Sequence, residues 1–345
     1  MSLGIIPLII SICKKQGWYD PVDPRKVHSG NIPRLGSIGF VPSFLIIAAI
    51  YLLTISRALF LTALPVFIAG LFVFILGVLD DFRDLRVRLK VLGQFVACII
   101  PVACGFQITQ IGALSLGIAG PFLTFFWLLA ITNAMNLIDG VDALCGSIAF
   151  FILLTLGCVL SGNSEYGGLT FILAGGVLGF LFYNRPKAKI FMGDGGSQFL
   201  GFMIAVLPLF KLPQPLPVDA ALFPMMILLL SIPILDTIAA IWRRTREQRT
   251  FFSADKSHLH HKLMNLGYTT VGILSFLLII QMGLCLIAAF AVLMVEGVQG
   301  LIILCIAFAA MIVFFAIIHY TNQSVTGLKG TGGGGGGGGG AGGPG

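Results

Sequence analysis

Residues 58–79 read ALFLTALPVFIAGLFVFILGVL and pass without a break into DDFRDLR at residues 80–86. The apolar part is longer than the ~20 residues that an α-helix needs to cross a lipid bilayer. The whole chain has the same character, because 57% of its 345 residues are hydrophobic, only 10% are charged and the mean hydropathy is +1.00. Soluble domains carry about 25% charged residues. The sequence therefore predicts an all-α integral membrane protein.

Ten apolar runs of this kind follow one another along the chain, and an eleventh, shorter run lies at residues 3–13. The ten are residues 38–55, 58–79, 91–112, 114–132, 143–161, 168–183, 192–210, 220–241, 271–294 and 298–318. We expect a polytopic bundle of ten to eleven transmembrane helices, forming one membrane domain over residues 1–326. Residues 327–345 are rich in glycine, which has no side chain to pack, so we expect a disordered tail or an artificial extension there.

Basic residues are concentrated on one side of the predicted bundle. If eleven spans alternate, every Lys and Arg except Arg57 and Lys211 falls on the same set of connections. Cytoplasmic connections carry an excess of Lys and Arg, so this side is predicted to be cytoplasmic, with the N-terminus outside and the C-terminus inside. The net charge of +7 then reflects topology and contact with the lipid bilayer. A bundle without a soluble domain argues against nucleic acid as a partner.

Five polar clusters interrupt the apolar runs, and the same topology places all of them on the cytoplasmic side. They are residues 23–36, 80–94, 133–144, 184–197 and 243–267. Most of the 14 acidic residues also lie on this side, although acidic residues contribute little to orientation. Polar groups at a membrane cost free energy unless they are paired or used. We therefore expect cytoplasmic active-site loops that converge on a cation-dependent site.

Asp80 and Asp81 follow directly on the run at residues 58–79. Adjacent carboxylates repel each other unless a cation or a proton lies between them. The alternative is a solvated helix end that nearby arginines neutralise. Lys90 lies at the start of the next run, and its ammonium suits a phosphate as a point charge. Asp80, Asp81 and Lys90 are therefore candidate catalytic residues.

Amides and carboxylates alternate in the third cluster, NAMNLIDGVDAL at residues 133–144. Asn133 and Asn136 are three residues apart, which is the spacing of one face of a helix end, and Asp139 and Asp142 follow. Their oxygens suit a hard cation such as Mg²⁺, which is bound by few protein groups together with phosphate. This cluster predicts ligands for a cation and a substrate.

A single carboxylate, Asp194, lies among glycines in residues 191–197, FMGDGGS. Glycines allow close approach of the backbone, and the N–H groups of a helix start bind phosphate oxygens. Asp194 is therefore a candidate catalytic residue and cation ligand. Phe191 is a candidate for stacking on a base, although a buried aromatic residue is the commoner role for such a side chain.

Three histidines lie in the only long polar connection, residues 242–270. Candidates for binding a pyrophosphate are His258, His260 and His261, together with Arg244. A zinc site lacks a suitable fourth ligand nearby, and a solvated basic loop is the other alternative. Taken together, the clusters predict a phosphate-binding cavity competent for Mg²⁺, whose chemistry is phosphoryl transfer.

Five motifs in this order carry a resemblance to a known family. They are RKVHSGNIPRLG (25–36), DDFRDLR (80–86), NAMNLIDGVDAL (133–144), KIFMGDGGS (189–197) and ADKSHLHHKL (254–263). Over about residues 14–268 the chain resembles the polyprenyl-phosphate N-acetylhexosamine-1-phosphate transferases of glycosyltransferase family 4. The HLHH loop is similar to the WecA/TagO-type branch, which uses UDP-N-acetylglucosamine, and differs from the related MraY-type translocases.

The resemblance implies an Mg²⁺-dependent transferase of the bacterial inner membrane. Undecaprenyl phosphate would attack the β-phosphorus of a UDP-N-acetylhexosamine, here UDP-N-acetylglucosamine, to give undecaprenyl-pyrophosphoryl-GlcNAc and UMP. Asp194 and Asn136 would be the Mg²⁺ ligands, with Mn²⁺ as a substitute, and Asp80 and Asp81 would face the lipid phosphate. The substrate contacts would come from Lys90, Asn133, Asp139, Asp142, Phe191, Arg244, His258, His260 and His261.

Other interpretations remain open from the sequence. Ser37, Ala143 and Lys187 stand where the family usually has glycine, glycine and proline, which weakens any statement about the exact sugar. An MraY-like transfer of phospho-MurNAc-pentapeptide is one alternative. A transporter or flippase is another, but its ionisable residues would lie near the centres of spans. A catalytically inactive lipid-binding scaffold would lack ligands, and none is missing. A homodimer is also left open.

Overall fold

The structure of the protein is a computed structural model that describes residues 1–19, 32–111, 114–161, 165–210, 217–248, 258–295 and 297–331. Most of the first polar cluster, residues 23–31, lies outside the described residues. So do Lys211 and the glycine-rich residues 332–345.

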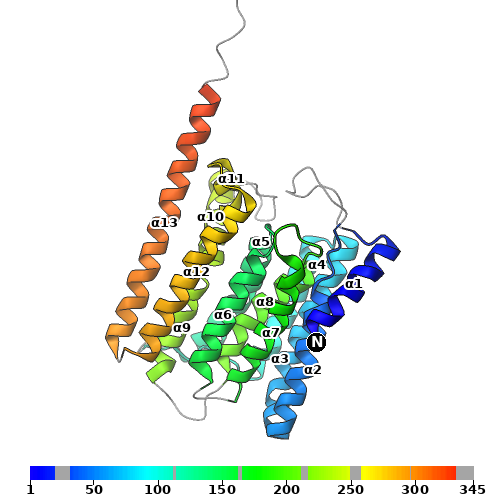
Figure 1. Cartoon of the computed structure of the whole chain (residues 1–345). Coiled ribbons are helices and arrows are strands. Elements are labelled where there is room, and N and C mark those ends of the chain that lie inside the picture. Colours follow the sequence, from blue (N-terminus) through cyan, green and yellow to red (C-terminus); the bar gives the residue numbers. More distant parts are fainter. Residues whose placement is uncertain are drawn as a thin grey trace, which may run out of the picture.

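The described residues are almost entirely helical, and Figure 1 shows long helices running side by side, with α13 at one edge of the bundle and α1 and α2 at the other. The helices are α1 (Ser2–Gln16), α2 (Ser37–Ile55), α3 (Arg57–Arg83), α4 (Val87–Ala103), α5 (Ala119–Ile138), α6 (Leu144–Leu160), α7 (Gly167–Asn184), α8 (Asp194–Val206), η1 (Leu207–Leu209), α9 (Pro217–Leu229), α10 (Ser231–Arg246), α11 (Leu259–Asn265), α12 (Thr270–Leu293) and α13 (Val298–Thr331). The strands are β1 (Gln110–Ile111) and β2 (Leu114–Ser115).

Six of the described helices, α2, α3, α5, α7, α12 and α13, are long and apolar enough to cross a membrane. α9 and α10 together are also long and apolar enough, although the chain bends by 69° at a short break between them. If they count as one, the described helices contain seven candidate spans. These helices confirm an all-α, multi-pass membrane protein. The remaining expected spans correspond to the shorter helices α1, α4, α6 and α8, of 15, 17, 17 and 13 residues.

Two predicted spans have the wrong bounds. The run at 91–112 ends as a helix at Ala103, and the run at 114–132 becomes helical only at Ala119. Between them the chain forms the β1–β2 hairpin, with Gln110 opposite Ser115. Gly105 (φ 90°) terminates α4 because it adopts a backbone conformation that other residues rarely take. Hydropathy alone does not register such a turn.

Helix α8 lies at the centre of the bundle, and every residue from Gly195 to Val206 is buried. It packs most closely against α3 and α5. A Cβ atom on Gly77 of α3 would lie 2.5 Å from the Cα atom of Gly195, so the two backbones touch. Phe199 of α8 contacts Phe44, with ring centroids 5.9 Å apart. This packing fixes where the first residue of α8, Asp194, is presented.

Candidate active site

The expected site residues meet at one end of the bundle, which we call the polar end. It is formed by the C-terminal ends of α3 and α5, the first turns of α4, α8 and α11, and the connection between α7 and α8. Four side chains mark it, and they are Asp80, Asp139, Asp194 and His258. The contacts below connect these elements to one another, so the described parts of the clusters at 80–94, 133–144, 184–197 and 243–267 lie close together.

Lys90 joins two of the predicted carboxylates. Its Nζ atom donates to Oδ2 of Asp194 and lies 2.8 Å from Oδ2 of Asp80. Asp80 also accepts a hydrogen bond from the backbone N–H of Leu85 at 2.8 Å. The three side chains are largely shielded from solvent, which strengthens their electrostatic attraction. Three helices, α3, α4 and α8, are thereby tied together by one ammonium group.

Asn136 approaches the same carboxylate from α5. Its Nδ2 atom donates to Oδ1 of Asp194 at 3.0 Å and to Oγ of Ser197 at 2.9 Å. Asn136 and Asp194, which the sequence analysis names as cation ligands, are therefore in direct contact. Asn133 lies one turn further from the polar end and donates to Oε1 of Gln94 at 2.9 Å. In this structure Asn133 thus supports a buried amide layer beneath the Asp194 cluster.

Asp81 has a different environment from its neighbour Asp80. Its Oδ1 atom accepts from the backbone N–H of Asp194 at 3.0 Å, and its Oδ2 atom accepts from the N–H of Gly195 at 3.2 Å. A carboxylate at a helix N-terminus satisfies backbone N–H groups that have no partner within the helix and interacts favourably with the helix dipole. Asp81 therefore caps α8 and holds Asp194 in place.

The turn between α5 and α6 is anchored to the connection that precedes α8. Asp142 is buried, and its Oδ2 atom accepts from the N–H of Ala188 at 3.1 Å. Asn184 accepts from the N–H of Ala143 at 2.9 Å and donates to the carbonyl of Ile190 at 2.7 Å. In this structure Asp142 therefore holds two connections together.

Asp139 lies just beyond the end of α5 and is half-buried. Burial, followed by the negative charges of Asp194, Asp81 and Asp142, raises the pKa of Asp139 to about 8. Near neutral pH this carboxyl group holds its proton. Phe191 lies on the opposite connection, where its backbone pairs with Pro33 and Gly36 over 2.8 and 2.9 Å.

The histidines lie on and beside α11, which packs over the turn between α5 and α6. A Cβ atom on Gly140 would lie 2.6 Å from Cε1 of His260. The rings of His260 and His258 are parallel, with centroids 6.1 Å apart, and the ring of His261 lies 4.2 Å from that of His260. Burial, then the charge of His261, lowers the pKa of His260 to about 4. His260 is therefore neutral near pH 7.

Asp236 is a site residue that the sequence reasoning did not select. It is buried on α10, accepts from the N–H of Leu259 at 2.8 Å and lies 2.9 Å from Nδ1 of His258. Asp236 lies inside the apolar run 220–241, and a carboxylate within a membrane span costs free energy unless it is paired. This position could have identified Asp236 from the sequence. Arg244 lies near the end of the same helix, half-buried.

The donor set at Asp194 fits a hard divalent cation. The carboxylates of Asp80 and Asp194 both contact the ammonium group of Lys90. The amide of Asn136 contacts Asp194. Among the described residues no group of three His, Cys, Asp or Glu side chains gathers at one point. Carboxylate and amide oxygens with few protein ligands are the chemistry of Mg²⁺, which completes its shell with water and phosphate.

The fold and this site define a multi-pass membrane protein with an acidic, cation-competent centre at one end of its helices. The sequence model of the family described as "Glycosyl transferase family 4" matches residues 63–211. A Bacillus subtilis (strain 168) protein named "Probable undecaprenyl-phosphate N-acetylglucosaminyl 1-phosphate transferase" is 35% identical over 77% of this chain and 75% of its own length. The chain belongs to this family.

Two further relatives have similar names. The Mycobacterium tuberculosis (strain CDC 1551 / Oshkosh) "Decaprenyl-phosphate N-acetylglucosaminephosphotransferase" is 32% identical over 71% of this chain and 68% of its own length. The Escherichia coli (strain K12) "Undecaprenyl-phosphate alpha-N-acetylglucosaminyl 1-phosphate transferase" is 30% identical over 75% of this chain and 72% of its own length.

Proposed function

We propose that the protein transfers N-acetylglucosamine 1-phosphate from UDP-N-acetylglucosamine to undecaprenyl phosphate. An oxygen of the lipid phosphate attacks the β-phosphorus, the bond from that phosphorus to the bridging oxygen breaks, and UMP leaves with the bridging oxygen. The names of the relatives support the substrates. The single structural observation that carries the proposal is the Asp80–Lys90–Asp194 cluster at the start of α8.

In this proposal Asp194 and the amide oxygen of Asn136 hold Mg²⁺, for which Mn²⁺ substitutes. Held there, Mg²⁺ would supply positive charge for the phosphoryl oxygens of the nucleotide sugar. Lys90, which connects the two carboxylates in this structure, contacts the pyrophosphate oxygens when substrate is bound. Asp80 positions the lipid phosphate, and Asp81 acts indirectly by capping the helix that carries Asp194.

The nucleoside end of the substrate lies between the turn of α5 and α6 and the histidines of α11. Asp139 lies beside this space and is proposed to form a hydrogen bond with the nucleoside. His260 is neutral, so its imidazole can form hydrogen bonds with the substrate. Phe191, His261 and Arg244 are proposed to complete the substrate contacts.

We further propose that eleven segments cross the bacterial inner membrane. They are α1, α2, α3, α4, α5, α6, α7, α8, the bent pair α9–α10, α12 and α13. The short segments α6 and α8 are mostly buried against longer neighbours, whereas α4 exposes several of its apolar side chains. The distribution of Lys and Arg supports a cytoplasmic location for the polar end.

A transfer assay tests the proposal. Purified protein with Mg²⁺, undecaprenyl phosphate and UDP-N-acetylglucosamine should release UMP, and D194N should abolish that release. The matched control is D84N, which makes the same chemical change at an exposed carboxylate that ends α3. UDP-MurNAc-pentapeptide serves as the competing donor. Absence of UMP release from every UDP-N-acetylhexosamine would refute the assignment.

A further inference from the structure

A groove of about 730 Å³ lies between α10, α11 and α13 at the polar end of the bundle. None of the described residues that line it belongs to the Asp80–Lys90–Asp194 cluster. Its volume is within the range of roughly 300–1,000 Å³ that is usual for small-molecule sites. The groove is therefore large enough to hold a ligand of its own.

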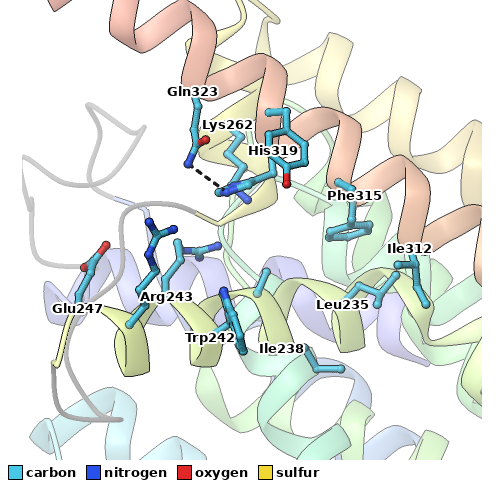
Figure 2. Close-up of a pocket in the computed structure, with 14 residues that line it drawn as sticks. Leu235, Ile238, Trp242, Arg243, Glu247, Lys262, Ile312, Phe315, His319 and Gln323 are labelled. Atoms are coloured by element: carbon cyan, nitrogen blue, oxygen red, sulfur yellow. Dashed lines mark hydrogen bonds between the residues drawn. The ribbon is translucent and has the colours of Figure 1, made fainter.

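The lining changes from apolar to basic along the groove, as Figure 2 shows. One end is formed by Leu235 and Ile238 of α10 and by Ile312 and Phe315 of α13. At the other end lie the polar groups Arg243, Glu247, Lys262, His319 and Gln323. Arg246 also lines the groove, and its charge acts on His319 together with those of Arg243 and Lys262. A ligand that fills this groove must have an apolar part and an anionic part.

The basic end carries an excess of positive charge. Arg243, Arg246 and Lys262 are basic, and among the described lining residues Glu247 is the one carboxylate. Three side chains from two helices thus present positive charge to the same space. Basic pockets between transmembrane helices are suited to anionic headgroups.

The groove also lies at the right depth in a membrane. Ile312 and His319 are seven residues apart on α13, which corresponds to roughly 10 Å along the helix axis. Trp242 and Tyr320 flank the basic end and are 71% and 68% exposed. Trp and Tyr prefer the interface between acyl chains and headgroups. The basic end therefore lies at headgroup level, and the apolar end lies among the acyl chains.

We propose that this groove binds an anionic phospholipid of the surrounding bilayer. The phosphate contacts Arg243, Arg246 and Lys262, and an acyl chain lies along Leu235 and Phe315. A soluble anion would leave the apolar half of the groove unfilled. This inference stands apart from the transfer reaction, because it concerns residues outside the Asp194 cluster.

Quenching of Trp242 by brominated lipids tests the proposal in the full-length protein. The protein is reconstituted in phosphatidylcholine vesicles that contain the same mole fraction of dibrominated phosphatidylglycerol or dibrominated phosphatidylcholine. Subtraction of the signal of W242F isolates Trp242 from the other two tryptophans. Dibrominated phosphatidylglycerol should quench Trp242 more strongly than dibrominated phosphatidylcholine does. Phosphatidylglycerol without bromine should relieve that quenching.

Charge variants make the test specific. Arg246 is exposed, so R246E should preserve the fold while removing the preference for phosphatidylglycerol. R243Q combined with R246Q should have the same effect. The control is R88Q, which removes an exposed positive charge on α4, outside the groove, and should leave the preference intact. Size-exclusion chromatography checks that each variant is folded.

Four outcomes would overturn the proposal. They are equal quenching by the two lipids, an unchanged preference in R246E, loss of the preference in R88Q, and relief of quenching by inorganic phosphate. A fifth would redirect it, because stronger relief by undecaprenyl phosphate than by phosphatidylglycerol would assign the groove to the polyprenyl lipid.

Discussion

Asp80 and Asp81 are neighbours in the sequence but contact different parts of the polar end. Successive residues of a helix point in directions roughly 100° apart. Asp80 therefore reaches Lys90, whereas Asp81 reaches the N–H groups of Asp194 and Gly195. The two adjacent carboxylates therefore have different roles. Asp80 faces the site, and Asp81 stabilises the helix that carries Asp194.

The two carboxylates should respond differently to amidation. D81N keeps only one acceptor oxygen for the start of α8, so we expect a loss of about 1–2 kcal/mol in stability together with slower UMP release. D80N should lose UMP release with a smaller change in melting temperature. The reason is that Asp80 accepts a hydrogen bond from one backbone N–H group, whereas Asp81 accepts from two. Thermal melting and the transfer assay measure the two effects. Equal destabilisation by both substitutions would contradict this division.

His260 should make stability depend on pH. Because burial lowers its folded pKa to about 4 from 6.5, the unfolded chain binds more protons than the folded chain between these values. Stability therefore falls as the pH falls from 6.5 to 4, by roughly 3 kcal/mol in total. H260Q should show a smaller drop in melting temperature between pH 7.5 and pH 4.5. An identical drop in wild type and variant would contradict the prediction.

Helix α11 is short, and it packs against α12 and α13 as well as contacting α10 and the turn between α5 and α6. Asp236 of α10 accepts from the N–H of Leu259 and contacts His258 at the start of α11. On the other side His260 lies directly over Gly140. A helix of seven residues has little stability of its own, so these contacts determine where the histidines lie.

Substitution of Gly140 should displace the His260 ring without unfolding the bundle. In G140A the new Cβ atom would lie 2.6 Å from Cε1 of His260, so the ring must move away. We expect UMP release to fall roughly tenfold to a hundredfold, because small misplacements of substrate-contacting groups are costly. G175A is the matched control, since nothing lies within 4 Å of the corresponding Cβ position. Full activity of G140A would refute this role for the contact.

The proposed orientation of the whole bundle can be tested with cysteine labelling. Cys104 is exposed and follows α4 at the end opposite to the polar end. A membrane-impermeant maleimide should label it in intact bacterial cells, and C104S should lose that label. A cysteine introduced by R88C, at the start of α4, should react only in inverted vesicles. Labelling of both positions from the same side would refute the orientation.

Hydropathy and charge were sufficient for the class of the fold because they record a local property. A run that is apolar on all sides and long enough to cross a bilayer is stable only in lipid or in a protein core. The same patterns could not locate the break between α9 and α10, the β1–β2 hairpin or the ends of α4 and α5. These depend on single turns and on packing, to which an average over many residues is insensitive.

The sequence by itself determined an all-α membrane protein, its family resemblance and the residue types of a phosphoryl-transfer site, since each is encoded in composition and motif. Only the tertiary structure decided that Lys90 joins Asp80 to Asp194, that Asp81 caps α8, and that Asp236 orients His258. The reason is geometric. Which side chains meet depends on the rotation and depth of helices far apart in the chain, and the packing around the buried helix α8 sets both.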